Sequence, residues 1–246
     1  MAGQASALSI KGLKFRYPGT EAWVVDIPEL ELARGEQMLL TGGSGAGKST
    51  LLQLIAGLTD PTQGHIAVDG IDIPFLQGAQ RDHYRGRKIG MIFQTFNLLM
   101  GFSALENVML ALMFSEIPAS EHRARAASLL HRLGIDRAEA SPEGLSVGQQ
   151  QRVAVARALA CDPVLVLADE PTASLDPENS VAAMDMIQNA CRDKGAALLC
   201  VSHDPAMKDR FSRRASLAEL GRPRPPLAIA KAEASSGEVA GRIGGV

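Results

Sequence analysis

The first third of the chain alternates apolar and polar residues with the period of a half-buried strand. Residues 8–17 (LSIKGLKFRY) and 23–32 (WVVDIPELEL) show this pattern, and residues 64–73 (GHIAVDGIDI) repeat it. Successive side chains of a strand point to opposite faces, so this period predicts strands with one apolar face. We expect the three segments to form an antiparallel β-layer.

Shorter, continuously apolar segments predict a second kind of strand. They lie at 36–40, 89–94, 164–168 and 197–201. Between the last two, apolar residues recur at helical spacing: Val181, Met184, Ile187 and Cys191. Strands that are apolar on both faces and alternate with amphipathic helices predict a parallel sheet covered on both sides.

Residues 103–160 are predicted to be helical throughout. Ser120 is expected to cap a helix that ends at Gly134 and whose apolar side is formed by Leu129, Leu130 and Leu133. The apolar leucines imply that this helix packs against others.

The end of the chain differs in composition from the rest. Residues 222–246 are dominated by proline, glycine, alanine and serine and keep no period, which predicts a disordered tail. The sequence therefore predicts one α/β domain over residues 1–221, with an inserted helical subdomain at about 95–160.

Composition narrows the class of protein. The chain has 246 residues, is 46% hydrophobic and carries a net charge of −2, so it lacks the basic excess of a nucleic-acid-binding protein. No apolar run reaches the ~18 residues of a membrane span, and no signal peptide is recognised. The three cysteines form no C-x-x-C pair and are predicted to be reduced thiols of a cytoplasmic protein.

Residues 42–49 (GGSGAGKS) match the phosphate-loop pattern G-x-x-x-x-G-K-[ST] between a predicted strand and a helix. Glycines let successive N–H groups turn toward phosphate oxygens, and the helix N-terminus attracts the same anion. Lys48 is expected to reach the β- and γ-phosphates, and the Ser49 hydroxyl to bind Mg²⁺. The alternative is an incidental glycine-rich turn. The predicted phosphate-binding residues are Gly42, Gly43, Ser44, Gly45, Ala46, Gly47, Lys48, Ser49 and Thr50.

Two carboxylates end the predicted strand at 164–168. Asp169 is placed to hold Mg²⁺ through water, because ligands of open α/β sheets bind at the carboxyl ends of strands. Glu170 is placed to accept a proton from a water that attacks the γ-phosphate. The alternative is an acidic pair that only caps the next helix. These residues predict a Mg-nucleotide hydrolase or kinase.

Residues 145–149 (LSVGQ), followed by QQRVAVARAL, resemble the signature motif of ATP-binding cassette (ABC) ATPases. The order of the other motifs is also similar over residues 7–205. The resemblance implies a P-loop NTPase core and further site residues. Tyr17 would stack on adenine, with Phe15 as its rival on the same strand; Gln94 would be the Q-loop glutamine and a magnesium ligand; Asp176 would belong to the D-loop; and His203 would be the switch histidine.

The signature also has a local interpretation. Ser146 with Gln149 three residues later is a capping box, so an ordinary helix cap is the alternative. In the family, this helix N-terminus faces the ATP of a second subunit. The resemblance then implies that Ser146, Gly148 and Gln149 contact nucleotide across a homodimer with two composite ATP sites. Val147 departs from the glycine that is usual there.

Two further features concern the C-terminal segment and the subfamily. Residues 211–223 (FSRRASLAELGRP) fall short of the strand–turn–strand pattern that the family usually has after the switch histidine. Residues 72–118, above all 85–114, resemble the ATPases of lipoprotein-release, macrolide-export and cell-division (FtsE-like) systems.

The resemblance implies a subunit at the cytoplasmic face of the membrane that hydrolyses ATP to drive a separate membrane permease. The permease would dock near residues 94–118, where four side chains predict either a helical core or an apolar groove: Phe102, Met109, Met113 and Phe114. The main alternative is an FtsE-like ATPase that acts mechanically on a membrane partner without transport. A small-molecule kinase is a third possibility, disfavoured by LSVGQ and Glu170.

Overall fold

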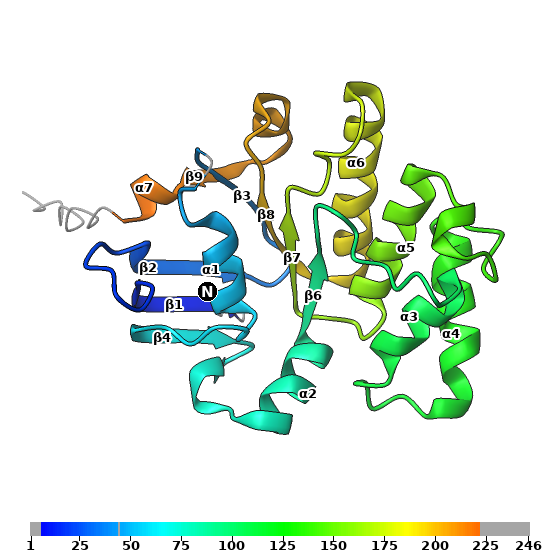
Figure 1. Ribbon diagram of the computed structural model, residues 1–246, viewed down its shortest axis with the longest axis horizontal. Coiled ribbons are helices and arrows are strands. Elements are labelled where there is room, and N and C mark those ends of the chain that lie inside the picture. The colour runs from blue at the N-terminus through cyan, green and yellow to red at the C-terminus, as the bar shows by residue number, and fades with distance from the viewer. Residues whose placement is uncertain (1–5, 44, 222–246) are drawn as a thin grey trace, which may run out of the picture.

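The computed structural model describes residues 6–43 and 45–221, so the predicted tail at 222–246 lies outside the described residues. It contains two sheets, and one helix packs against both of them (Figure 1). The first sheet has four antiparallel strands in the order β2-β1-β4-β5, which confirms the predicted antiparallel layer. Its strands are β1 (Ser6–Phe15), β2 (Val25–Ala33), β4 (Gln63–Val68) and β5 (Ile71–Asp72).

The second sheet has five strands in the order β6-β7-β8-β3-β9, and every adjacent pair is parallel. Its strands are β3 (Gln37–Thr41), β6 (Ile89–Ile92), β7 (Leu165–Asp169), β8 (Ala197–Val201) and β9 (Arg213–Ser216). Because all of these strands run the same way, the segments that follow β3, β6, β7 and β8 emerge together at the carboxyl ends of the strands. We call this side the sheet edge, and it is where open α/β sheets bind ligands.

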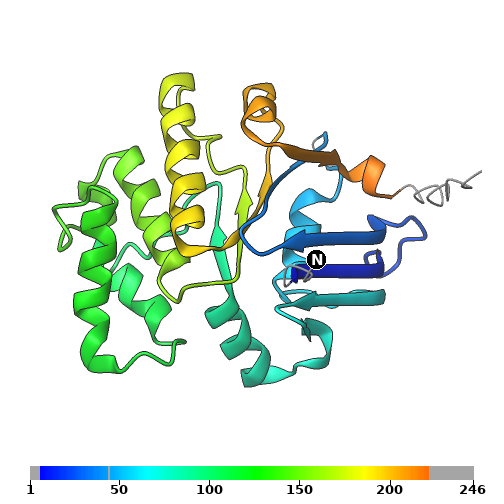
Figure 2. The same ribbon diagram turned by 180° about the vertical axis from the view of Figure 1, so that it is seen from behind.

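The helices fall into a core group and a group beyond β6 and β7 (Figures 1 and 2). Helix α1 follows β3, α2 leads into β6, and α6 lies beside β7 and β8. The α-helices are α1 (Lys48–Ile55), α2 (Gly78–Lys88), α3 (Ala104–Leu112), α4 (Ala119–Arg132), α5 (Val147–Leu159), α6 (Pro177–Lys194) and α7 (Leu217–Leu220). Short 3₁₀ turns lie at Ile73–Phe75, Pro142–Gly144 and Pro205–Arg210.

Strand alternation divides the interior into apolar layers. Leu165 and Leu167 of β7 face α1 and the antiparallel sheet, whereas Val166 and Ala168 face α5 and α6. A separate apolar cluster joins α3, α4 and α5. The parallel strands are thus buried on both faces, which explains why they are continuously apolar.

The helical region differs from its prediction in two respects. Residues 103–160 are not helical throughout, because loops separate α3, α4 and α5. Ser120 is not a cap: α4 begins at Ala119 after Pro118, and its N-terminus has no side-chain cap. Leu129 and Leu130 are buried as predicted, and Gly134 takes a left-handed conformation just beyond the helix end, with φ +73°.

The C-terminal segment contains a strand that the sequence pattern did not reveal. Residues Arg213–Ser216 pair in parallel with β3, Met38 opposite Arg213 and Thr41 opposite Ser216. This strand is polar because it is the outermost strand of the sheet and has a neighbour on one side only. Helix α7 follows this strand directly, so the described part of the segment contains one strand and one helix.

The three cysteines carry free thiols, as predicted. Cys191 and Cys200 are buried, and Cys161 is partly buried. Burial raises the pKa of Cys161 to about 11 and that of Cys191 to about 12, so these thiols are unreactive near neutral pH. Within the residues that the structure describes, no helix is both long and apolar enough to cross a bilayer.

Candidate functional site

The phosphate loop runs from the end of β3 into α1. Gly45 and Gly47 have left-handed backbones, with φ +75° and +89°. A Cβ on Gly47 would lie 2.6 Å from the carbonyl oxygen of Val24, so glycine is required there. Lys48 Nζ donates to the carbonyls of Gly42 (2.8 Å) and Gly43 (2.9 Å), which places the ammonium group across the loop. Ser44 lies outside the described residues.

The two aromatic candidates for base stacking differ in exposure. Strand β1 ends at Phe15, which is 6% exposed, whereas Tyr17 lies beyond the strand and is 47% exposed. The two rings nonetheless contact each other edge to face, with their centroids 5.0 Å apart. The Tyr17 hydroxyl lies 3.1 Å from Thr50 Oγ1, which connects the exposed ring to the first turn of α1.

The two acidic residues lie at the carboxyl end of β7. Asp169 is the last residue of the strand, and Glu170 follows it with φ +46°. A left-handed backbone at a residue other than glycine costs of order 1–3 kcal/mol, and such strain is concentrated at functional sites. The Glu170 N–H donates to Val201 O at 2.9 Å, which holds this residue against the end of β8.

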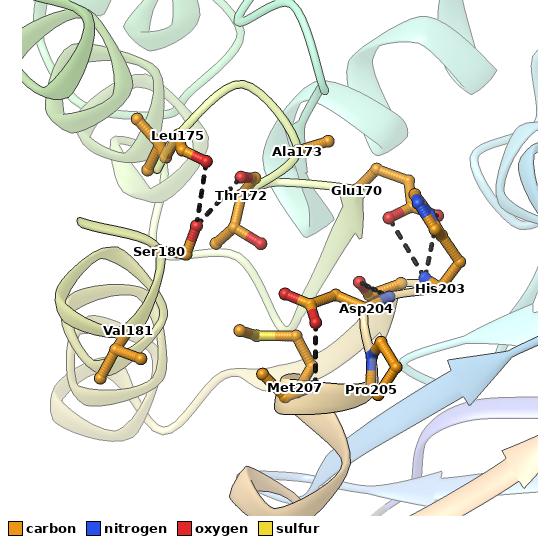
Figure 3. Close-up of a pocket in the computed structure, with 12 residues that line it drawn as sticks. Glu170, Thr172, Ala173, Leu175, Ser180, Val181, His203, Asp204, Pro205 and Met207 are labelled. Carbon is orange, nitrogen blue, oxygen red and sulfur yellow. Dashed lines mark hydrogen bonds and ion pairs between the residues drawn. The ribbon is translucent and has the colours of Figure 1, made fainter. Parts of the chain in front are cut away.

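His203 contacts Glu170 from the neighbouring strand (Figure 3). Its Nδ1 lies 2.7 Å from Glu170 Oε1, and its backbone N–H donates to both carboxylate oxygens, at 3.1 and 3.3 Å. The imidazole is mostly exposed, whereas the Glu170 side chain is only 13% exposed. Of the four residues predicted to be catalytic (Glu170, His203, Gln94 and Lys48), Glu170 and His203 therefore form one hydrogen-bonded unit at the sheet edge.

The segment after β6 is held by two other elements. Gln94 is exposed, and its backbone carbonyl accepts from Ser174 Oγ at 3.3 Å. Arg157 of α5 donates to the carbonyls of Phe96 and Asn97, both at 2.6 Å, and burial lowers the pKa of its guanidinium. These contacts connect the Gln94 loop to α5 and to the segment before α6.

Asp176 caps α6 rather than reaching toward the phosphate loop. Its Oδ1 accepts from the backbone N–H of Asn179 at 3.0 Å, and its Oδ2 accepts from the Asn179 side-chain amide at 2.6 Å. These hydrogen bonds lower the pKa of the Asp176 carboxyl. Beside this cap, a pocket of about 520 Å³ extends from Glu170 and His203 to Val181 of α6 (Figure 3).

The signature residues form the predicted capping box. Ser146 Oγ accepts from the Gln149 N–H at 3.3 Å, and the Ser146 N–H donates to Gln149 Oε1 at 2.9 Å. Val147 is the first residue of α5, where a β-branched side chain fits, and it is 47% exposed. A Cβ on Gly148 would meet no atom within 4 Å, so the helix N-terminus is open.

The signature and the phosphate loop lie on different sides of the molecule. Helices α5 and α1 are separated by strands β6 and β7 in both views (Figures 1 and 2). The structure thus brings together the segments after β3, β6, β7 and β8, whereas Ser146 begins a helix that β6 and β7 separate from α1.

The residues expected to hold magnesium supply oxygen donors. Ser49 provides a hydroxyl in the first turn of α1, Asp169 a carboxylate and Gln94 an amide oxygen, and all three lie at the same sheet edge. Among the described residues there is no group of three or more His, Cys, Asp or Glu that would form a metal cage. Mg²⁺ bound with a nucleotide takes most of its ligands from water and phosphate, so this donor set fits.

Comparison with known proteins gives the family. The family model described as ABC transporter matches residues 25–173. The chain belongs to the ABC transporter family. The cassette is therefore an ATP-binding ATPase with a P-loop core, as the motifs predicted.

Several relatives are similar over most of the cassette. An uncharacterized ABC transporter ATP-binding protein of Thermotoga maritima is 42% identical over 73% of this chain and 76% of its own length. The methionine import ATP-binding protein MetN 2 of Rhodococcus jostii is 41% identical over 80% of this chain and 58% of its own. The macrolide export ATP-binding/permease protein MacB of Syntrophobacter fumaroxidans is 41% identical over 74% of this chain and 27% of its own.

Solved structures agree with the fold. The ATP-binding cassette MJ0796, described as a dimeric structure of a post-hydrolysis state bound to ADP and Pi, superposes with a TM-score of 0.76 at 34% identity, covering 87% of this chain and 95% of that one. CbiO1 of Clostridium perfringens, part of the ABC transporter complex cbiONQ, superposes with a TM-score of 0.72 at 28% identity, covering 82% of this chain and 80% of that one.

An exposed apolar surface lies close to the Gln94 loop. The exposed apolar side chains on either side of α3 are Leu99, Met100, Phe102, Met113 and Phe114, with exposed fractions between 41% and 67%; we refer to them together as the exposed apolar surface. Met109, the fourth residue predicted with this surface, is instead partly buried in the cluster of α3, α4 and α5. A hollow of about 290 Å³ beside Phe114 also reaches Phe93, Asn97 and Arg157.

Two buried polar residues, Asn107 and Gln151, and the partly buried Arg157 were not singled out from the sequence. Asn107 accepts from the Leu99 N–H at 2.8 Å and donates to the carbonyls of Leu99 and Ser103, which fixes the loop before α3. Gln151 and Arg157 donate from α5 to the segments near Glu170 and Gln94. Their signal in the sequence is a polar residue at an inward position of an otherwise apolar helix face.

Proposed function

We propose that the cassette is the ATP-hydrolysing subunit of a transporter of the export or lipoprotein-release type, and that two copies close around two ATP molecules. The position of Ser146 carries this proposal. The capped, open N-terminus of α5 is suited to bind a phosphate, yet it lies away from the phosphate loop of its own chain. A head-to-tail pair of cassettes would bring each signature to the other's ATP.

The chemistry would be divided among residues at the sheet edge. Tyr17 would stack on the base, and the loop N–H groups with Lys48 would bind the phosphates. Mg²⁺, held by Ser49, Gln94 and Asp169, would neutralise charge on the phosphate oxygens. Glu170 would accept the proton of the attacking water, and His203, hydrogen-bonded to Glu170, would orient the γ-phosphate and the water. Asp176, on the D-loop, would face the partner subunit.

The membrane partner would dock at the exposed apolar surface formed by Leu99, Met100, Phe102, Met113 and Phe114. This surface begins a few residues after Gln94, so a displacement of the Gln94 loop would move a permease helix that is docked there. Apolar and methionine-rich surfaces of this kind accept amphipathic helices. The cassette would then be a peripheral protein on the cytoplasmic face of the membrane.

The composite site is tested by mixing two variants. Ser146→Arg places a bulky side chain at the signature, and Lys48→Ala removes a phosphate ligand. Neither variant alone should trap nucleotide in a closed dimer, whereas a mixture should recover one intact site per heterodimer. If the mixture shows no recovery, or if Ser146→Arg alone dimerises normally with ATP, the trans arrangement is wrong and Ser146 is only a helix cap.

The transporter type is tested by purification from membranes. The similarity of residues 85–114 supports an export or lipoprotein-release system, while the relatives are named for import as well as export. The attached membrane subunit would identify the type: a subunit without a substrate path would favour the FtsE-like alternative. Phosphate released without a phosphorylated acceptor would separate the cassette from a small-molecule kinase.

A further inference from the structure

Gln151 is a buried glutamine that connects the signature helix to the catalytic segment. It lies two residues after Gln149 on α5 and is 1% exposed. Its Nε2 donates to the carbonyl oxygen of Pro171 at 2.8 Å. Proline has no backbone N–H, so this carbonyl is the only backbone hydrogen-bonding group of Pro171.

The bond acts on the residue directly after Glu170. Glu170 has φ +46°, a conformation that must be held in place by its surroundings. On one side, its N–H donates to Val201 O at 2.9 Å, and on the other, its carbonyl accepts from the Ala173 N–H at 3.1 Å. The hydrogen bond from Gln151 fixes the Pro171–Thr172 peptide group, one residue beyond Glu170. Because the φ of Pro171 is set by its ring, fixing this group restricts the backbone movement that would let Glu170 relax.

The same bond lies beside a hollow between two helices. The hollow has a volume of about 340 Å³ and lies between α5 and α6, with Gly148 of the signature on one side and Leu175 on the other. Gln151 lines this hollow and reaches past it to Pro171. A shift of α5 would therefore pull on the backbone at Glu170 through a direct polar contact.

We propose that Gln151 is a positioning residue for hydrolysis: its amide holds the Pro171 carbonyl, next to the strained backbone of Glu170, and so positions the Glu170 carboxylate. Because Gln151 shares a helix with Ser146, it also links the signature that serves the partner's ATP to the base that serves the chain's own ATP. This inference rests on the proposed roles of Glu170 and Ser146.

Gln188 provides a matched control. It is also a buried glutamine, 3% exposed, on helix α6, and its Nε2 donates to the carbonyl of Arg210 at 3.1 Å. Replacing either residue by methionine keeps the volume, removes a buried amide and leaves one carbonyl without its donor. The two variants should therefore lose similar amounts of thermal stability, but only one of the lost bonds lies next to Glu170.

The experiment compares steady-state ATP hydrolysis and ATP binding of the full chain for Gln151→Met and Gln188→Met. We expect Gln151→Met to lower kcat at least tenfold, with KM and the Kd for ATP within twofold of the wild type. Gln188→Met should keep kcat within twofold. Equal kcat values for the two variants would overturn the proposal, as would a Gln151→Met effect confined to KM.

Two further variants keep the test decisive. If Gln151→Met does not fold, Gln151→Asn keeps the amide but shortens its reach by one methylene, and it should lower kcat in the same way; wild-type turnover of Gln151→Asn would overturn the proposal. Glu170→Gln tests the base independently. If Glu170→Gln retains hydrolysis, Glu170 is not the base and that part of the proposed function is wrong. If Glu170→Gln abolishes hydrolysis while Gln151→Met is as active as the wild type, only the proposed role of Gln151 is wrong.

Discussion

His203 Nδ1 lies 2.7 Å from Glu170 Oε1, and the backbone N–H of His203 donates to the same carboxylate. Strands β7 and β8 are adjacent, and Asp169 is paired with Val201, so the two residues are brought together by strand register. The carboxylate is thus oriented by the segment that follows the neighbouring strand.

Glu170→Gln should reduce kcat by at least about 100-fold, because the amide keeps the shape of the side chain but cannot accept a proton. ATP binding should persist, so the variant should accumulate as an ATP-bound closed dimer. Phosphate release and size-exclusion chromatography with ATP measure the two effects. Glu121→Gln, on an exposed position of α4, is the control and should leave both unchanged. Unchanged turnover of Glu170→Gln would show that another group is the base.

Lys48→Ala should act on binding rather than on the chemical step. The ammonium group donates to the carbonyls of Gly42 and Gly43 and is the cation placed across the loop. Its removal should weaken ATP binding by at least about tenfold, since hydrogen bonds to charged groups contribute about 1.5–3 kcal/mol. Titration of a fluorescent ATP analogue measures this change. Lys208→Ala, on an exposed turn, should bind as the wild type does. Wild-type affinity of Lys48→Ala would contradict the assignment of Lys48 as a phosphate ligand.

Asn107→Leu should destabilise the fold by about 1–3 kcal/mol, because it removes the acceptor of the partly buried Leu99 N–H and one of the two donors to the Leu99 carbonyl, which keeps only the Phe102 N–H. Asn107 is fully buried, and its amide also donates to Ser103 O at 3.0 Å. Urea unfolding measures the loss. Asn189→Leu, at an exposed position of α6, should change stability by less than about 0.5 kcal/mol. Similar losses in the two variants would mean that the Asn107 hydrogen bonds contribute little.

Asp162→Asn should lower stability in a pH-dependent way. Asp162 precedes β7 and pairs with Arg125 of α4 and Lys194 of α6. Burial raises the pKa of its carboxyl, but the hydrogen bonds and charges of Lys194 and Arg125 outweigh this effect, so the pKa lies below the ordinary value of 3.8. A lowered folded-state pKa gives stability that is fully present above 3.8 and is lost as the pH falls through the folded-state value.

The carboxyl is half exposed, so the effect of Asp162→Asn at pH 7 should be only about 1 kcal/mol. Urea unfolding at pH 7 and at about pH 2 should show a difference from the wild type that disappears at the lower pH. Asp209→Asn, whose side chain is 97% exposed, should show no difference at either pH. A loss from Asp162→Asn that is independent of pH would show that packing, not charge, is affected.

Features that depend on neighbours along the chain were determined by the sequence alone. The alternation of residues 8–17 and 23–32 specified two strands, and the spacing of glycines and Lys48 in residues 42–49 specified a phosphate loop. Ser146 and Gln149 stand three residues apart, so their reciprocal hydrogen bonds follow from helix geometry. In each case, the physical cause acts within one strand, one turn or one helix end.

Features that depend on distant segments were decided by the tertiary structure. The strand order β6-β7-β8-β3-β9 brings Gln94, Glu170 and His203 to one edge, and no local pattern contains that order. The end of β1 at Phe15, not the alternation of aromatic residues, leaves Tyr17 exposed. Gln151 reaches a carbonyl 20 residues away, and Arg157 reaches one 61 residues away. A buried polar side chain must find a partner, but which carbonyl satisfies it depends on how helices and strands pack.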